Sequence, residues 1–322
     1  MNGKAKMIVT RRMPDAVEAQ MQDLFDATLN YEDAPLTKDQ LIAAVKAADI
    51  LAPTVTDQLT AEVINEAGPQ LKLIANFGVG VNHIDLGAAK AKGIAVTNTP
   101  DVLTEDTADL TMALILMVRR RLGEGERMVR AKAWPGWTPT QLMGQRVTSK
   151  KLGIIGMGRI GAAVAHRARG FDMEIHYHNR SRTDAAIEAE LQATYWDDLD
   201  AMLAEVDIVS INSPHTQETA NLLNRDRLSK MKPGAYLVNT ARGGIVDEKA
   251  LLDMIKSGAI GGAGLDVFDG EPAVNPAFLE MDEVVLLPHL GSATVEGRVD
   301  MGEKVIANAL AMLAGDPLPD PI

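Results

Sequence analysis

The segment that decides the fold is residues 151–161, which reads KLGIIGMGRIG. It begins with a short apolar run typical of a buried strand and ends in a GxGxxG motif. Glycines between a strand and a helix allow a tight turn and bring backbone N–H groups close to a pyrophosphate at the helix N-terminus. The motif alone is weak, but a further strand ends about twenty residues later, as a dinucleotide site requires. We therefore assign to a cofactor site Gly156, Met157, Gly158, Arg159, Ile160 and Gly161.

Strands and helices alternate from this motif toward the carboxyl end of the chain. Apolar runs predict six strands, at residues 152–155, 174–178, 207–211, 235–239, 262–267 and 284–287. Six strands with intervening helices are typical of a Rossmann-type doubly wound parallel sheet. We expect this dinucleotide-binding domain to span residues 101–289.

The first hundred residues show a second alternation of the same kind. Strands are predicted at residues 7–10, 48–52, 71–75 and 94–97, which indicates another α/β domain with a parallel sheet. After residue 289 only one helix is predicted, at about residues 293–313, and it lacks strands of its own. Residues 1–100 and 290–322 are therefore expected to form one discontinuous domain. Residues 119–148, which are rich in charge and contain Trp134 and Trp137, are predicted to be a connecting arm.

Bulk composition narrows the class of protein. A chain of 322 residues exceeds what one hydrophobic core usually supports. Its net charge of -12 disfavours nucleic acid and anionic membranes as partners. The chain has no cysteine, hence no disulfide or thiolate metal site, and we assign no metal site. It shows no signal-peptide pattern and no apolar run of membrane-spanning length, so a cytoplasmic location is expected.

The end of the second Rossmann strand indicates the cofactor. An NAD site usually has Asp or Glu there, which accepts a hydrogen bond from the ribose 2′-hydroxyl. This chain has Asn179, followed by Arg180, Ser181 and Arg182. No carboxylate would repel a 2′-phosphate, and two guanidinium groups could pair with it. We predict that NADP(H) is preferred and NAD(H) possible; a solvated turn beside bound NAD is the alternative.

Functional side chains follow three further strands of this domain. Reduction of a 2-oxo acid needs a cation for the carboxylate and a proton donor for the carbonyl oxygen. Arg242 offers a bidentate guanidinium, and the imidazole of His289 can donate a proton. Glu271 would favour the imidazolium form of that histidine. His215 is a rival proton donor, and in isolation Arg242 could be a structural ion-pair partner and Glu271 a solvated loop acid.

With these residues the chain resembles the D-isomer-specific 2-hydroxyacid dehydrogenase family over nearly its whole length. In that family an Arg, a Glu 29 residues later and a His about 18 further on form the active site, which is the spacing of Arg242, Glu271 and His289. The resemblance implies an oxidoreductase with a flavodoxin-like α/β substrate domain and an active site in the cleft between domains. It also implies a homodimer, with residues 119–148 as the dimerisation arm.

The resemblance implies further site residues. Residues 76–85, NFGVGVNHID, resemble the family's substrate loop, with a carboxylate held by amides near Val79 and Gly80 and with Asn76 in the same site. Cofactor contacts are implied for Thr107, Ser213, Pro214, Thr240, Ala241, Asp266 and Gly291, with the nicotinamide carboxamide at Asp266. Trp137 is a candidate for contact with a neighbouring subunit's site.

Asn179 and the Asn-Phe-Gly-Val-Gly loop are most similar to the glyoxylate and hydroxypyruvate reductase branch. We therefore expect an enzyme that reduces these small 2-oxo acids with NADPH. An NAD-dependent glycerate or other D-2-hydroxyacid dehydrogenase stays open as an alternative. So does a cofactor-sensing binding protein similar to the transcriptional corepressors of the same family.

Overall fold

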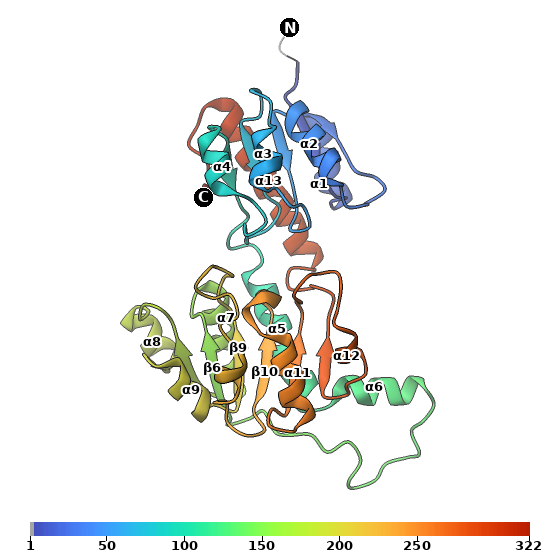
Figure 1. The fold of residues 1–322 in the computed structure, drawn as a ribbon, viewed down its shortest axis with the longest axis vertical. Coiled ribbons are helices and arrows are strands. Elements are labelled where there is room, and N and C mark those ends of the chain that lie inside the picture. The colour runs from blue at the N-terminus through green and yellow to red at the C-terminus, as the bar shows by residue number, and fades with distance from the viewer. Residues whose placement is uncertain (1–2) are drawn as a thin grey trace. The chain divides into compact units, whose positions relative to one another are not determined.

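The computed structural model describes residues 3–322 of the chain. The chain forms two compact units (Figure 1). The first comprises the residues up to Leu103 together with Ala293–Ile322, and the second comprises Thr104–Ser292. Each of the two boundaries between the units lies three residues farther along the chain than the boundary expected from the sequence. Residues 1–2 of the expected first domain lie outside the described residues.

The first unit contains a five-stranded parallel sheet in the order β2-β1-β3-β4-β5. This order is flavodoxin-like. The strands are β1 (Lys6–Val9), β2 (Asp26–Thr28), β3 (Ile50–Ala52), β4 (Leu73–Ala75) and β5 (Ala95–Thr97). The helices are α1 (Asp15–Leu24), α2 (Lys38–Ala47), α3 (Ala61–Asn65), α4 (Leu86–Ala91) and α13 (Val295–Ala314). The predicted strand count of four missed β2, a three-residue strand with no buried side chain.

The last helix, α13, packs on the first unit. Met301, Val305 and Ile306 of this helix join a buried cluster with residues of α1, β1, β3 and β4. Gly302 faces α1 so closely that a Cβ would lie 2.4 Å from the Val17 side chain. The helix therefore completes the core of a unit that begins nearly three hundred residues earlier in the chain.

The second unit contains a seven-stranded parallel sheet in the order β12-β11-β10-β9-β6-β7-β8. Its strands are β6 (Lys151–Ile155), β7 (Glu174–His178), β8 (Ala193–Tyr195), β9 (Ile208–Ile211), β10 (Tyr236–Asn239), β11 (Gly262–Leu265) and β12 (Val284–Leu286). Counted from β6 along the chain, the spatial order is 3-2-1-4-5-6 with one additional strand, which is the Rossmann-type order. The predicted fold class is thus confirmed. The prediction of six strands missed β8, a short strand at the sheet edge.

Helices cover both faces of this second sheet. They are α5 (Thr104–Arg119), α6 (Leu122–Arg130), α7 (Arg159–Arg169), α8 (Ala185–Leu191), α9 (Leu199–Glu205), α10 (Arg225–Leu228), the 3₁₀ helix η1 (Gly243–Ile245), α11 (Glu248–Lys256) and α12 (Pro276–Leu279). One buried cluster lies between the sheet and α5 and α7, and another between the sheet and α9, α10 and α11. Because both faces are buried, the central strands β9 and β10 are apolar almost without interruption.

The arm connects α5 to β6 through α6 and a long loop, which is visible in Figure 1. Its two ends meet at buried Arg119. The Arg119 carbonyl accepts from the Gln145 amide at 2.7 Å, and Arg119 Nη2 donates to Gln145 Oε1 at 2.8 Å. Helix α6 has no buried side chain. Within residues 3–322, none of the helices combines the length and apolarity needed to cross a membrane.

Candidate active site

The glycine-rich motif forms the turn between β6 and α7. Gly156 has a φ of +100°, and a Cβ there would lie 2.7 Å from the Ser213 amide nitrogen. A Cβ at Gly161 would lie 2.1 Å from the Gly156 carbonyl oxygen. Both positions therefore require glycine, one for the turn and one for close packing of helix on strand. At Gly158 a Cβ would meet nothing within 4 Å, so the backbone before α7 faces open space that a phosphate could fill.

Strand order reverses between β6 and β9, and two polar side chains follow β9 at this point. Asn212 Nδ2 and Ser213 Oγ are buried, and neither has a hydrogen-bond partner among residues 3–322. Buried polar atoms are normally paired. Ligands of doubly wound sheets bind where the strand order reverses. Asn212 and Ser213, with Pro214 exposed beside them, therefore lie where a bound dinucleotide could pair with their polar atoms.

Asn179, at the end of β7, contacts the glycine-rich turn. Its Oδ1 accepts a hydrogen bond of 2.7 Å from the Met157 amide, and the Gly156 amide donates to the His178 carbonyl at 3.1 Å. The residue that replaces the usual carboxylate thus holds the turn to which we assign the pyrophosphate.

The two arginines after Asn179 have different surroundings. Arg182 donates from Nε and Nη2 to the two oxygens of Glu188, both at 2.7 Å, and the Tyr177 hydroxyl donates to the same carboxylate. The hydrogen bonds from Arg182 and Tyr177 lower the pKa of Glu188 to about 2, and burial raises the pKa of Tyr177 to about 12. Arg180 is exposed and makes no hydrogen bond or ion pair within the described chain. Arg182 thus has a carboxylate partner in its own unit, while 64% of its side chain is exposed, and its role at a 2′-phosphate stays a prediction.

His289 and Glu271 form a hydrogen-bonded pair at the carboxyl edge of the same sheet. His289 Nδ1 lies 2.8 Å from Glu271 Oε2, and the Phe268 amide donates to Glu271 Oε1 at 2.9 Å. Burial acts to raise the pKa of Glu271, but the hydrogen bonds and positive charge around it outweigh burial and lower the pKa below its usual value. An ionised Glu271 accepts from Nδ1–H, which leaves His289 Nε2 as the ring nitrogen that can transfer a proton.

Asp266 holds the loop that carries the histidine. The carboxylate accepts from the Leu290 amide at 2.7 Å and from the Gly291 amide at 2.9 Å, and the Asp266 carbonyl accepts from the His289 amide at 2.9 Å. Burial raises the pKa of Asp266. Thr107 of α5 donates to the Gly291 carbonyl at 2.9 Å. Three predicted cofactor residues, Thr107, Asp266 and Gly291, are thus in one hydrogen-bonded group.

Arg242 follows β10 and is held through its own backbone. Asn239 donates to the Arg242 carbonyl at 2.9 Å and accepts from the Ala241 amide at 3.0 Å. Burial lowers the pKa of Arg242, while the charge of Glu271 acts in the opposite direction. A Cβ at Gly243 would lie 1.9 Å from the Phe268 carbonyl carbon, so this loop touches the one that carries Glu271. The structure therefore brings Arg242, Glu271 and His289 together.

The predicted substrate loop belongs to the first unit. Fully buried Asn76 donates to the Gly78 and Gly80 carbonyls at 2.9 and 3.1 Å, and its Oδ1 lies 3.0 Å from His83 Nε2. Asn76 thus shapes the loop from inside, rather than presenting its side chain to a ligand. Within the described chain the amides of Val79 and Gly80 donate no hydrogen bond, so both can serve a carboxylate.

Other residues of the site were not predicted. Asn98 donates to the Val79 carbonyl at 2.9 Å, and Thr111 shares a 2.8 Å hydrogen bond with Thr240. Asparagine at or directly after the last residue of a strand, as at positions 239 and 98, was the available signal, because its side chain readily bonds nearby backbone. The rival histidine, His215, lies next to Gly244, where a Cβ would be 3.0 Å from its Nε2.

A Rossmann-type sheet with a glycine-rich turn and an Arg, Glu and His at neighbouring strand ends defines a nicotinamide-dependent dehydrogenase. The family model for the D-isomer specific 2-hydroxyacid dehydrogenase, NAD binding domain, matches residues 112–291. The chain belongs to this family, as the resemblance implied.

Named relatives cover almost all of the chain. It is 39% identical to a glycerate dehydrogenase of Hyphomicrobium methylovorum, over 94% of each chain. It is 42% identical to a glyoxylate reductase of Pyrococcus furiosus, over 97% of this chain and 94% of the relative. Among solved structures, an NADPH-dependent glyoxylate/hydroxypyruvate reductase from Sinorhizobium meliloti, in complex with NADP and malonate, superposes with a TM-score of 0.89 at 33% identity, over 99% of this chain and 97% of that one. The chain is accordingly an oxidoreductase that binds a nicotinamide cofactor and acts on small 2-oxo and 2-hydroxy acids.

Proposed function

We propose that this enzyme reduces glyoxylate and hydroxypyruvate to the corresponding 2-hydroxy acids and prefers NADPH. The observation that carries the proposal is the His289–Glu271 pair beside Arg242, in one unit with Asn179 and an unpaired Arg180. Relatives named glyoxylate reductase and a similar structure solved with NADP support the substrate class and the cofactor.

The residues that we assign to the cofactor follow strands of the second sheet or lie beside its carboxyl edge. We assign the pyrophosphate to the turn at residues 156–161 and the 2′-phosphate to Arg180 with Ser181. We assign the nicotinamide half to the edge formed by Thr107, Ser213, Pro214, Thr240, Ala241, Asp266 and Gly291. When bound, NADPH supplies the hydride that goes to C2 of the substrate.

The protein contributes charge and a proton. Within the second unit we assign the substrate carboxylate to the guanidinium of Arg242. Within the first unit we take the amides of Val79 and Gly80 as the donors that a carboxylate would use. His289 Nε2 gives its proton to the carbonyl oxygen as C2 receives the hydride, so that the product is a 2-hydroxy acid. Glu271 stabilises the imidazolium before the transfer and orients the neutral ring after it.

Steady-state kinetics test this function. Purified protein is assayed with a panel of short 2-oxo acids, each with NADPH and with NADH. We expect the largest kcat/KM with glyoxylate or hydroxypyruvate and NADPH. A clear preference for NADH would favour the glycerate dehydrogenase alternative, whose name one relative carries. Tight NADPH binding without turnover of any member of the panel would favour the cofactor-sensing alternative.

We also propose that a second copy of the chain binds the arm, residues 119–148, in a cytoplasmic homodimer. Helix α6 and the following loop expose Val129 and Trp137, with 59% and 80% of their surface accessible. The arm carries seven Lys and Arg against two Asp and Glu, whereas the chain as a whole has a net charge of -12. A basic, apolar arm fits the acidic body of another copy.

A further inference from the structure

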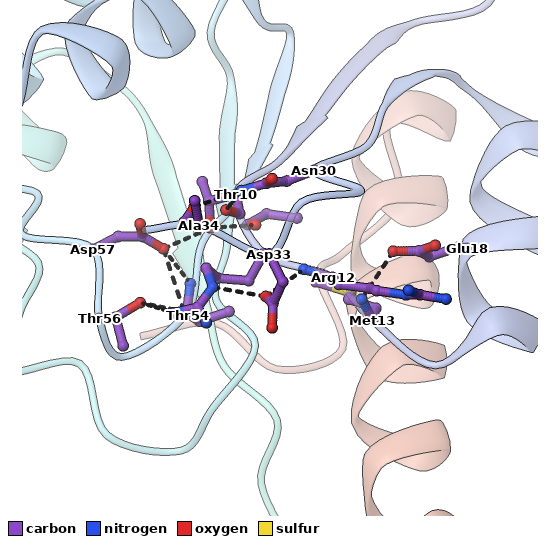
Figure 2. A network of polar contacts seen from close by, with 12 residues as sticks. Thr10, Arg12, Met13, Glu18, Asn30, Asp33, Ala34, Thr54, Thr56 and Asp57 are labelled. Atoms are coloured by element: carbon purple, nitrogen blue, oxygen red, sulfur yellow. Dashed lines mark hydrogen bonds and ion pairs between the residues drawn. The ribbon is translucent and has the colours of Figure 1, made fainter. Parts of the chain in front are cut away.

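The flavodoxin-like sheet of the first unit has a reversal point of its own. Strand order changes direction between β1 and β3, and such sheets bind or hold functional groups outside the carboxyl ends of these strands. Figure 2 shows a network of polar side chains at this place. Thr10 follows β1, and Thr54, Thr56 and Asp57 follow β3.

Asp57 is the centre of this network and is only 1% exposed. Its Oδ2 accepts from the hydroxyl of fully buried Thr10 at 2.5 Å, and from the Thr54 amide at 2.8 Å. Its Oδ1 is buried without a hydrogen-bond partner among residues 3–322. A carboxylate buried in this way is costly to folding, so stability alone gives no reason for an acid here. What the carboxylate does achieve is a direct connection between the ends of two strands.

Residues 53–59, which Asp57 connects to Thr10, are hydrogen-bonded to the substrate loop at both ends of this segment. The Phe77 amide donates to the Pro53 carbonyl at 2.8 Å. Farther along, the Leu59 amide donates to the His83 carbonyl at 2.9 Å, and the Asp85 amide donates to the Leu59 carbonyl at 2.9 Å. Asp57 lies between these two points. The position of residues 77–85 therefore depends on residues 53–59, and the position of residues 53–59 depends on Asp57.

We propose that Asp57 is a positioning residue for the 2-oxo acid. By holding residues 53–59 against Thr10, it places the amides of Val79 and Gly80 where they bind the substrate carboxylate. This inference rests on the proposed function, because it takes residues 76–85 as the substrate loop. Asp57 belongs to the first unit, whereas the residues that we assign to the cofactor belong to the second, so we expect its loss to affect one ligand only.

The chain offers a matched control at the other edge of the same sheet. Asp49 accepts from the Lys6 amide at 2.7 Å and so connects β1 and β3 at their amino ends. Its removal costs a similar hydrogen bond between the same two strands, but at the edge opposite the substrate loop. If KM rises because the sheet as a whole is less stable, it should rise in both the Asp49 and the Asp57 variants. If KM rises because the substrate loop is displaced, it should rise only in the Asp57 variant.

The experiment uses the full chain with Asp57→Ala, Thr10→Val, Thr10→Ser and Asp49→Ala. Steady-state kinetics give KM and kcat for glyoxylate, and fluorescence titration gives the Kd for NADPH. We expect Asp57→Ala to raise KM about five- to thirty-fold, because hydrogen bonds to a charged group are lost, while the Kd for NADPH changes less than about twofold. Thr10→Val should raise KM to a smaller extent, and Thr10→Ser, which keeps the hydroxyl, should restore it. Asp49→Ala should leave KM unchanged.

Amide hydrogen exchange gives a second result that needs no activity. We expect the Phe77 and Asp85 amides, which are bonded to residues 53–59, to exchange at least about tenfold faster in Asp57→Ala and Thr10→Val than in Asp49→Ala. Equal KM values in wild type and Thr10→Val, or equal exchange at these amides in all variants, would overturn the proposal. A wild-type protein inactive on every 2-oxo acid would instead overturn the proposed function, and exchange would still decide whether Asp57 holds the loop.

Discussion

Glu188 of α8 accepts two hydrogen bonds of 2.7 Å from Arg182, whereas Arg180, two residues earlier in the chain, has no such partner within residues 3–322. Arg182 also lies over the Tyr195 ring, 5.6 Å from its centroid. Arg182 is thus held within its own loop, and we propose that Arg180 is the arginine that binds a 2′-phosphate.

Cofactor preference should follow this difference. We expect Arg180→Ala to lower the NADPH to NADH ratio of kcat/KM about ten- to a hundredfold, the value of one charge-assisted hydrogen bond to phosphate. Arg182→Ala should change the ratio much less and should mainly lower the melting temperature. Kinetics with both cofactors provide the measurement. A larger loss of preference in the Arg182 variant than in the Arg180 variant would reverse our assignment.

The same ion pair makes stability depend on pH in the acid range. The pKa of Glu188 is about 2 in the folded protein, against an ordinary value of 4.5, so the folded state binds fewer protons between these values. Its contribution to the free energy of unfolding is complete above about pH 4.5 and is lost as the pH falls toward about 2. Denaturant unfolding of wild type and Glu188→Gln should therefore differ at pH 6 and converge near pH 2. A constant difference across this range would contradict the prediction.

Proton transfer should depend on the histidine and its carboxylate partner. We expect His289→Ala to lower kcat about 10²- to 10⁴-fold, because the proton donor is removed, while the Kd for NADPH stays near the wild-type value. Glu271→Gln should lower kcat and shift the pH profile of kcat/KM toward lower pH, since the imidazolium loses its stabilising charge. Substitution of the rival histidine, His215→Ala, serves as the control. Should His215→Ala reduce kcat more than His289→Ala, the proton donor would be His215.

Self-association should depend on the exposed face of the arm. We expect Val129→Glu to shift the protein from dimer to monomer in light scattering, because a charge would enter an apolar interface. Leu313→Glu is a matched control, since Leu313 is also exposed, at 47%, but belongs to α13 of the first unit. A wild-type protein that is already monomeric at micromolar concentration would contradict the dimer proposal.

Local patterns in the sequence were sufficient for most of the fold. Each predicted strand occurs in the structure, and the helix predicted at about residues 293–313 occurs as α13, because apolar runs and helix starts are encoded within a few neighbouring residues. The strands β2 and β8 were missed because each has three residues and none of them is buried. An edge strand of this length has no apolar pattern from which to predict it.

By itself the sequence determined the two parallel sheets, the glycine-rich turn and the spacing of Arg242, Glu271 and His289, since these are properties of residue type and order. Only the tertiary structure decided what the polar side chains bind. In the folded chain Arg182 pairs with Glu188, and the Asn76 side chain bonds the backbone of its own loop. Asp57 bonds Thr10, which lies 47 residues away in the chain. The reason is physical: a hydrogen bond depends on angles and on distances of about 3 Å, and these are set when distant strands pack side by side.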